Sequence, residues 1–265
     1  MTLKLYNSLK LIEFKLRKIF KIKSKDKTID SFELIHHWDF TKIDFPTLEK
    51  SFRFTPPWGD MVNNRQIAKF IKENVKLDSN GIHFMTTKVN DDKIPYRVSG
   101  MSTKKESDLP AFGRIEAEVF ISQYKGQWPA IWTVDPVKTM PEFDLFEFIW
   151  SLNSDEPKFE GNLHWGTDYK SKKYKYNALG KFPLSILDKP IKIVGEFYPN
   201  ETIYYINDFP FWRKKGSFSP NNKIVLLTGG VHPNGGPTGD GVWESMRVSY
   251  LKFYKLTDEL PNKNP

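Results

Sequence analysis

Three carboxylates stand close together in an otherwise apolar stretch of the sequence. Residues 141–150 read PEFDLFEFIW, so Glu142, Asp144 and Glu147 are embedded among aromatic and aliphatic side chains. Such a stretch predicts a buried strand, where neighbouring anions repel one another and are rarely kept for structural reasons. Close carboxylates can cleave a glycosidic bond, because one attacks the anomeric carbon while another protonates the leaving oxygen. The row therefore predicts glycoside hydrolysis, with the middle aspartate raising the pKa of one glutamate.

The geometry of a strand sets a condition on this chemistry. Side chains alternate across a strand, so Glu142 and Asp144 share a face, whereas Glu147 falls on the opposite face. A one-residue bulge between Asp144 and Glu147 restores all three carboxylates to one face and turns Phe143 and Phe148 into the core. The hydrolase hypothesis therefore requires a bulged strand.

Two other interpretations of the row stay open, namely a calcium site and a polar strand whose groups are satisfied. A tight row on one strand suits the many-oxygen cage of calcium poorly. His36, His37 and His83 have no ligand spacing with acidic residues, so we expect no catalytic metal.

Aromatic residues flank the row on both sides. Trp128 and Trp132 precede it, and His164 and Trp165 follow it. Sugar rings present apolar faces, and rigid aromatic rings with a few polar groups are typical of ligand sites. We expect the three tryptophans to bind substrate, and His164 to hydrogen-bond either Asp144 or the sugar.

The remaining sequence predicts many short strands separated by polar turns. We expect strands at 89–92, 96–103, 112–124, 191–198, 202–206, 209–212, 223–227 and 246–254, a helix at 64–74, and a glycine-rich loop from 229 to 241. Closely spaced strands without a linker or repeat favour a single all-β sandwich.

Composition and charge narrow the possible functions. The chain has 265 residues, 39% of them hydrophobic, which argues against disorder, and it has no cysteine for disulfides or thiolate chemistry. Its apolar runs are too short to span a bilayer. Residues 1–27 hold nine of the 40 basic residues and two of the 32 acidic ones, so the main body is nearly neutral. A nearly neutral body does not favour nucleic-acid binding.

The basic N-terminal segment, residues 1–28, has an apolar stripe. Leu5, Leu9, Ile12, Leu16 and Ile19 recur at helical spacing. Lysines and a glutamate interrupt the apolar run, so the segment does not read as an ordinary secretory signal. Three interpretations stay open: a helix that packs on a neighbour, an amphipathic element that contacts an anionic membrane surface or a carrier assembly, and an unusual export signal.

The residues described above resemble glycoside hydrolase family 16, whose bulged active strand follows the pattern Glu-x-Asp-x-x-Glu. Residues 142–147 match this pattern, and further pieces match in order: 99–100, 112–117, 128–132, 164–165 and 250–254. The resemblance covers residues 32–256, so we expect a catalytic domain at 29–258 and a tail at 259–265.

The resemblance implies a β-jelly-roll sandwich of two curved antiparallel sheets with a concave substrate cleft. It implies retaining, endo-acting hydrolysis of a β-linked polysaccharide, with Glu142 as nucleophile, Asp144 as assisting acid and Glu147 as general acid/base. The expected substrate is a β-1,3- or mixed-linkage β-glucan. The alternatives are a red-algal galactan (agar, porphyran or carrageenan) and a non-catalytic lectin-like domain that binds carbohydrate.

Two features depart from the family pattern. Ser249 stands where many members carry an aspartate that contributes to a structural calcium site, so calcium is doubtful and no cofactor is expected to be required. Members are usually exported, which predicts an extracellular location, yet this sequence begins with the charged segment.

Overall fold

The structure of the protein is a computed structural model, and it describes residues 32–60, 67–137, 140–166, 173–181, 189–218 and 221–257. The predicted N-terminal helix and the C-terminal tail lie outside these residues. Phe32–Leu256 form one compact unit, and the fold described below is that of this unit.

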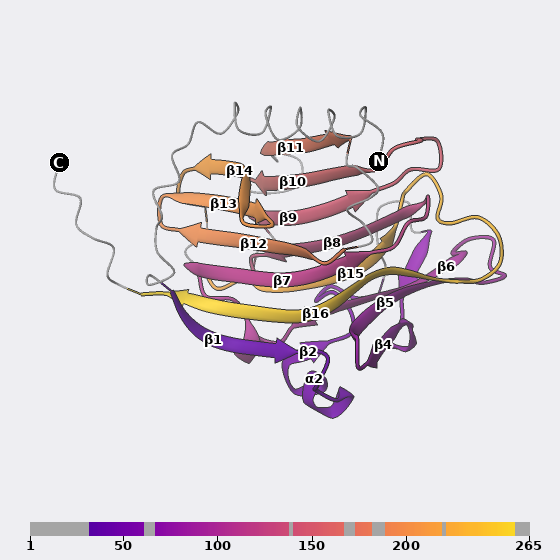
Figure 1. Cartoon of the computed structure of the whole chain (residues 1–265), viewed down its shortest axis with the longest axis horizontal. Coiled ribbons are helices and arrows are strands. Elements are labelled where there is room, and N and C mark those ends of the chain that lie inside the picture. The colour runs from indigo at the N-terminus through magenta and orange to yellow at the C-terminus, as the bar shows by residue number, and fades with distance from the viewer. Residues whose placement is uncertain are drawn as a thin grey trace. The chain divides into compact units, whose positions relative to one another are not determined.

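Twelve strands follow one another along a continuous hydrogen-bonded path that folds into two layers (Figure 1). The first layer contains, in spatial order, β11 (Lys173–Lys181), β10 (Lys158–Trp165), β9 (Glu142–Ile149), β8 (Gln127–Val134), β15 (Ile224–Val231) and β6 (Tyr96–Thr103). The second layer contains β5 (Gly81–Lys88), β16 (Val242–Leu256), β7 (Gly113–Ile121), β12 (Ile191–Tyr198), β13 (Glu201–Ile206) and β14 (Phe209–Lys215).

Shorter elements extend these layers. β1 (Phe32–Asp39) pairs with β16, β4 (Val75–Asp78) pairs with β5, and both β2 (Phe52–Arg53) and β3 (Ala68–Phe70) pair with β6. The described helical segments are α2 (Phe45–Ser51) and the 3-10 turns η2 (Lys72–Asn74) and η3 (Lys105–Ser107). In the part of the chain that is described, no helix has the length and apolar character needed to cross a membrane.

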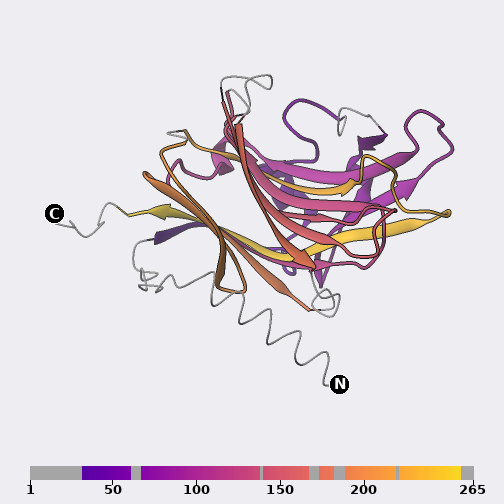
Figure 2. The same ribbon diagram turned by 90° about the horizontal axis from the view of Figure 1, so that it is seen from above.

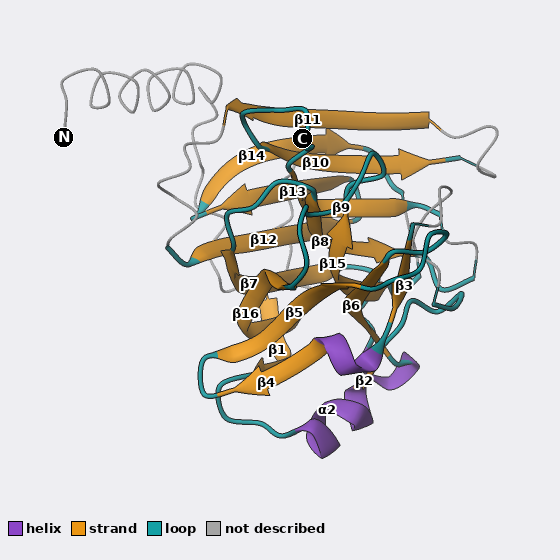
Figure 3. Ribbon diagram, turned by 90° about the vertical axis from the view of Figure 1, so that its right-hand side faces the viewer, coloured by secondary structure: helices purple, strands orange, loops and turns teal. Residues whose placement is uncertain are grey.

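Apolar side chains from the two layers meet to form the core. Phe143 of β9 packs edge-on against Phe197 of β12, with ring centroids 5.1 Å apart. Phe159 of β10 packs in the same way against Phe211 of β14, at 6.0 Å. Viewed from above and from the side, the strands are curved and lie in two layers (Figures 2 and 3). The predicted jelly-roll sandwich of two curved antiparallel sheets is confirmed.

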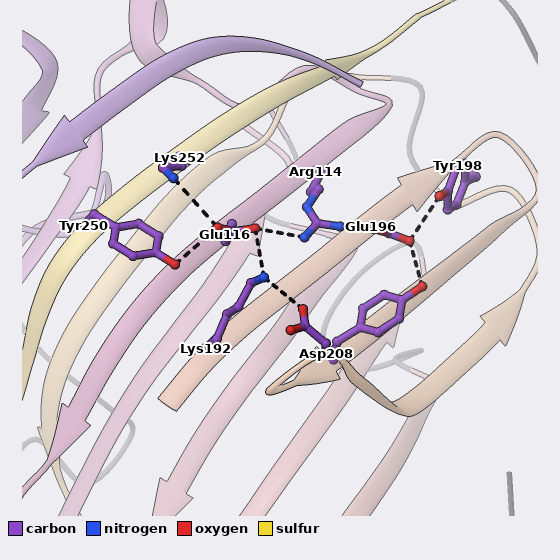
Figure 4. Close-up of polar contacts among 9 residues, drawn as sticks. Arg114, Glu116, Lys192, Glu196, Tyr198, Asp208, Tyr250 and Lys252 are labelled. Atoms are coloured by element: carbon purple, nitrogen blue, oxygen red, sulfur yellow. Dashed lines mark hydrogen bonds and ion pairs between the residues drawn. The ribbon is translucent and has the colours of Figure 1, made fainter. Parts of the chain in front are cut away.

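The face of the second layer that points away from this core carries a polar network (Figure 4). Arg114 of β7 donates to Glu116 at 2.8 Å and to Glu196 of β12 at 2.7 Å. The hydroxyls of Tyr198 and Tyr205 both donate to Glu196, at 3.0 and 2.8 Å. Each charge in this network has an opposite charge or a hydrogen-bond donor beside it, and the network links the paired strands β7 and β12. A structural role therefore accounts for these charged residues without a catalytic one.

Several predicted strands match the structure closely, and two predictions are wrong. The strands predicted at 96–103 and 191–198 coincide with β6 and β12. The helix predicted at 64–74 is wrong at residues 68–70, which form β3, parallel to β6; of the described residues in this range, 72–74 are helical, as the 3-10 turn η2. The strand predicted at 89–92 is also wrong, since the Asp91 carboxylate accepts from the N–H groups of Lys93 and Ile94 and fixes a turn.

The glycine-rich loop is shorter than predicted. Gly229 and Gly230 belong to β15, where they pair with Pro129 and Trp128 of β8. A side chain at Gly230 would come within 2.5 Å of the Trp128 carbonyl oxygen, so the close approach of two backbones explains this glycine.

Candidate active site

The strand β9 contains the bulge that the hydrolase hypothesis requires. Along β8, Ile131 pairs with Phe146, but the next residue, Trp132, pairs with Asp144, so Leu145 is the extra residue. The pairing of β9 with β10 shifts at the same place. The prediction of a one-residue bulge between Asp144 and Glu147 is therefore confirmed.

Both residues of the bulge point into the core. Leu145 and Phe146 are fully buried, and the Phe146 ring lies 4.9 Å from that of Phe159. Leu145 reaches β12, where a Cβ added to Gly195 would come within 2.4 Å of a Leu145 methyl carbon. The absence of a side chain at Gly195 thus makes room for the bulged residue.

The three carboxylates consequently lie on the face of β8, β9 and β10 that points away from the second layer, which we call the carboxylate face. Asp144 is buried, and Glu142 and Glu147 are largely buried with a small part of each exposed. Asp144 is also close enough to Glu147 to raise its pKa by charge repulsion. The sequence-based expectation that the row shares one face agrees with this arrangement.

Glu147 has the environment of a carboxylic acid that holds its proton more tightly than an ordinary glutamate does. Burial raises the pKa of Glu147 well above its ordinary value, and the Asp144 charge raises it further. Two donors act in the opposite direction: Trp128 Nε1–H lies 2.8 Å from Oε1, and the Asn162 amide donates to Oε2. Burial and repulsion prevail, so Glu147 can serve as the proton donor.

The other end of the row is organised by His164 on β10. Its Nε2 atom lies 3.3 Å from Asp144 Oδ2 and 3.7 Å from Glu142 Oε1. This position confirms that His164 lies beside the middle acid. Glu142 and Asp144 thus both lie beside an imidazole, whereas Glu147 lies beside the Trp128 and Asn162 donors.

The two predicted tryptophans of β8 lean in opposite directions. Trp128 points toward β9, where its indole N–H meets Glu147. Trp132 points toward β15, where its Nε1–H lies 3.3 Å from the Thr228 hydroxyl oxygen. Trp128 therefore has a role that the sequence did not indicate, since it orients an acid as well as offering a ring surface.

Trp165 is separate from the carboxylate row. It follows His164 on β10 and so points to the other face of the strand. Its ring lies 5.8 Å from that of Phe218 and 5.3 Å from Lys214 Nζ, which belongs to β14 of the second layer. The substrate-binding role predicted for Trp165 has no support in these contacts.

Two residues of the site were missed from the sequence, and both precede His164 on β10. Asn162 holds Glu147 through its amide, and Glu160 is the direct register partner of Glu147. Burial raises the pKa of Glu160, whose charge in turn raises the pKa of Glu147. The sequence could have indicated both residues, because positions 160, 162 and 164 are polar and alternate with apolar or glycine residues. This alternation places them on the same face of the strand as His164.

The site offers one group of possible metal ligands. Glu142, Asp144 and His164 each present a ligand atom, and these atoms lie within 4.8 Å of one another. The expectation that no catalytic metal is required therefore stays a prediction.

The structural calcium implied by the family resemblance is a separate question. The Ser249 hydroxyl donates to Glu118 at 2.6 Å, and the Ser249 carbonyl accepts from the Phe40 N–H at 2.9 Å. A hydroxyl engaged in this way does not replace a carboxylate ligand, so these contacts give calcium no support at this position.

Comparison with known proteins identifies the fold. No protein-family model and no curated protein matches the sequence. Among solved structures, the laminarinase catalytic domain of Thermotoga maritima superimposes with a TM-score of 0.67 at 16% identity, over 86% of this chain and 100% of that one. A family 16 mixed-linkage glucan enzyme of Bacteroides ovatus, bound to an oligosaccharide product, gives 0.66 at 16% identity, over 82% and 99%.

A third structure comes from work on endo-acting O-glycanases that human gut bacteria express to begin mucin breakdown. It gives a TM-score of 0.67 at 18% identity, over 86% of this chain and 92% of that one. The identities of these neighbours to the chain are low, at 16–18%. What they share with this chain is the sandwich that glycoside hydrolase family 16 enzymes adopt.

Proposed function

We propose that the protein is a retaining, endo-acting glycoside hydrolase that cleaves a β-linked polysaccharide. The observation that carries the proposal is the bulge at Leu145, because it puts Glu142, Asp144 and Glu147 on one face. The fold supports it, since the neighbours include a laminarinase and a mixed-linkage glucan enzyme.

In the first step of the proposed reaction, a Glu142 oxygen attacks the anomeric carbon while Glu147 gives its proton to the glycosidic oxygen. The bond to the leaving sugar breaks, and a glycosyl ester forms on Glu142. In the second step, ionised Glu147 takes a proton from water, whose oxygen attacks the same carbon and frees Glu142. Burial and the Asp144 charge both raise the pKa of Glu147, which favours the protonated form needed at the start.

A neutral β-glucan, with β-1,3 or mixed linkages, is the proposed substrate. Four carboxylates gather at this site: the catalytic row and Glu160. A sulfate group placed near them would be repelled, which disfavours sulfated galactans such as porphyran and carrageenan.

A reducing-sugar assay on laminarin, lichenan, xyloglucan, agarose, porphyran and carrageenan, with and without a chelator, tests the proposal. We expect turnover of laminarin or lichenan that the chelator does not change. Glu142→Gln and Glu147→Gln should each lose turnover by at least about a thousandfold while still binding the polysaccharide. Glu33→Gln, an exposed change on β1, is the matched control.

The assay separates the alternatives. Turnover of a galactan alone would show that the substrate is a red-algal galactan and not a β-glucan. Binding of polysaccharide without turnover by the natural sequence would identify a lectin-like domain. Aryl glycosides with good leaving groups should be cleaved better by Glu147→Gln than by Glu142→Gln, because only the former keeps the nucleophile. The reverse order would contradict the assigned roles.

We further propose that the basic segment, residues 1–28, holds the enzyme on an anionic surface, either a membrane or a carrier assembly. Its nine basic residues and its apolar stripe support this proposal. The full-length protein should sediment with vesicles that contain anionic lipid and remain in solution with neutral ones. Equal sedimentation with both would exclude electrostatic attachment to lipid.

A further inference from the structure

Trp58 presents a large exposed ring beside the carboxylate face. Its side chain is 49% exposed, and its ring centroid lies 5.6 Å from that of Trp132, with the planes tilted by 52°. Trp132 is the register partner of Asp144 on the adjacent strand. A residue from the N-terminal part of the chain is thereby brought to within one side chain of the carboxylate row.

The turn that carries Trp58 is restricted in conformation. Pro56 and Pro57 precede Trp58, and the Gly59 N–H closes a β-turn on the Pro56 carbonyl at 3.2 Å. Pro57 occupies the second position of this turn, where its fixed φ angle is favoured. Gly59 has a φ of +117°, which a residue with a side chain rarely adopts.

Both ends of the turn are attached to the sandwich. On one side, the Ser102 hydroxyl of β6 donates to the Thr55 carbonyl at 2.7 Å. On the other, Phe70 N–H of β3 donates to the Asp60 carbonyl at 2.6 Å, and Lys69 forms an ion pair with the Asp60 carboxylate at 2.8 Å. The backbone that carries the exposed indole is therefore held in place, and the ring itself contacts that of Trp132.

A ring that is fixed before binding loses less conformational freedom when a ligand arrives, so more of the contact energy appears as affinity. The neighbouring Trp132 ring is itself fixed by its hydrogen bond to Thr228. Two tilted indole rings offer an apolar corner, and this surface suits the C–H face of a pyranose ring.

We propose that Trp58 and Trp132 form a sugar-binding subsite on the β15 side of the carboxylate row, which takes a pyranose unit of a long neutral β-glucan chain. This inference rests on the proposed hydrolase function and specifies one part of the same site. Chains long enough to cover both the row and the Trp58 ring gain the additional contact, whereas short oligosaccharides do not.

The test compares laminari-oligosaccharides of increasing length on the full-length protein. Trp58→Ala should lower the ratio of kcat/KM for the longest to that for the shortest cleaved oligosaccharide by about tenfold. Trp58→Phe, which keeps an aromatic ring, should restore part of the ratio. Leu34→Ala removes an equally exposed apolar side chain from β1 and should leave the ratio unchanged.

Binding to laminarin, measured by calorimetry in a Glu142→Gln background, provides the second readout. We expect Trp58→Ala to weaken binding by about the same factor as the kinetic ratio. A length dependence and an affinity that both survive Trp58→Ala would overturn the subsite while leaving the hydrolase function standing. Weaker binding by Trp58→Ala in a protein whose natural sequence cleaves nothing would preserve the subsite and overturn the hydrolase.

Discussion

The indole N–H of Trp128 donates to Oε1 of Glu147 over 2.8 Å, from β8 to the adjacent β9. This hydrogen bond favours the ionised form of Glu147, whereas burial and the Asp144 charge favour the protonated form. The acidity of the proposed proton donor is thus set by opposing neighbours, each of which can be changed separately.

Trp128→Phe keeps a ring at this position and removes the donor. Because the ionised carboxylate loses a hydrogen bond, the pKa of Glu147 should rise, and the alkaline limb of the kcat/KM profile should move to higher pH. The loss of orientation should lower kcat/KM by at least about tenfold. Trp132→Phe makes the same change on the same strand, and an equal shift of its alkaline limb would contradict this interpretation.

Glu160→Gln should shift the profile in the opposite direction. Glu160 is the register partner of Glu147, and its negative charge raises the pKa of Glu147. Removal of that charge stabilises ionised Glu147, so the pKa falls and the alkaline limb moves to lower pH. Glu73→Gln, an exposed change in η2, serves as the control. A pH profile identical to that of the natural sequence would show that Glu160 does not act on the acid.

Gly195→Ala should disturb the bulge from the opposite layer. The added Cβ would approach Leu145 to 2.4 Å, which forces either β12 or the bulge to move. We expect the free energy of unfolding, measured in denaturant, to fall by about 1–3 kcal/mol. Turnover per folded molecule should fall as well. Gly241→Ala is the control, because its nearest neighbour would lie at 3.5 Å.

Lys223 makes the stability of the protein depend on pH. Its ammonium lies 4.8 Å from the Phe197 ring centroid and 5.8 Å from that of Phe143, and burial lowers the pKa of Lys223 to about 7. Between pH 7 and the ordinary lysine value of 10.5, the unfolded chain binds more protons, so stability from this group rises with pH. Below pH 7 Lys223 is protonated in both states, and the cost of burying its charge is present in full.

Lys223→Met should therefore raise the melting temperature at pH 6 and change it less at pH 10. An increase of about 2–4 °C corresponds to 1 kcal/mol for a protein of this size. Scanning calorimetry at both pH values provides the measurement. A lower melting temperature for the variant at pH 6 would show that the hydrogen bond from Lys223 to the Ala111 carbonyl outweighs the cost of burying the charge.

Local patterns in the sequence predicted much of the fold, and they failed where pairing between distant segments decided the outcome. Ile67, Phe70 and Ile71 have helical spacing, yet residues 68–70 pair with residues 96–98 as a strand. β5 was missed although Ile82 and Phe84 alternate with more exposed residues, as expected for a strand with one buried face.

The features of the candidate site that depend on the alternation of side chains along a strand could be predicted from the sequence. The carboxylate row and its bulge follow from residue types at positions 142–147. The same alternation places Trp165 and His164 on opposite faces of β10. The prediction that both face the substrate could therefore have been rejected from the sequence. The direction of the Trp128 indole and the approach of Trp58 depend on side-chain packing and on a distant turn, which no local pattern specifies.

The extra residue in β9 changes which positions of the strand must be apolar. Before it, the inward side chains have odd numbers, as in Phe143 and Leu145; after it they have even numbers, as in Phe146 and Phe148. Deletion of Leu145 would therefore invert the second half of the strand, carrying Glu147, the proposed proton donor, inward. A regular strand grafted from another sandwich would keep three carboxylates on one face only if they stood at alternate positions.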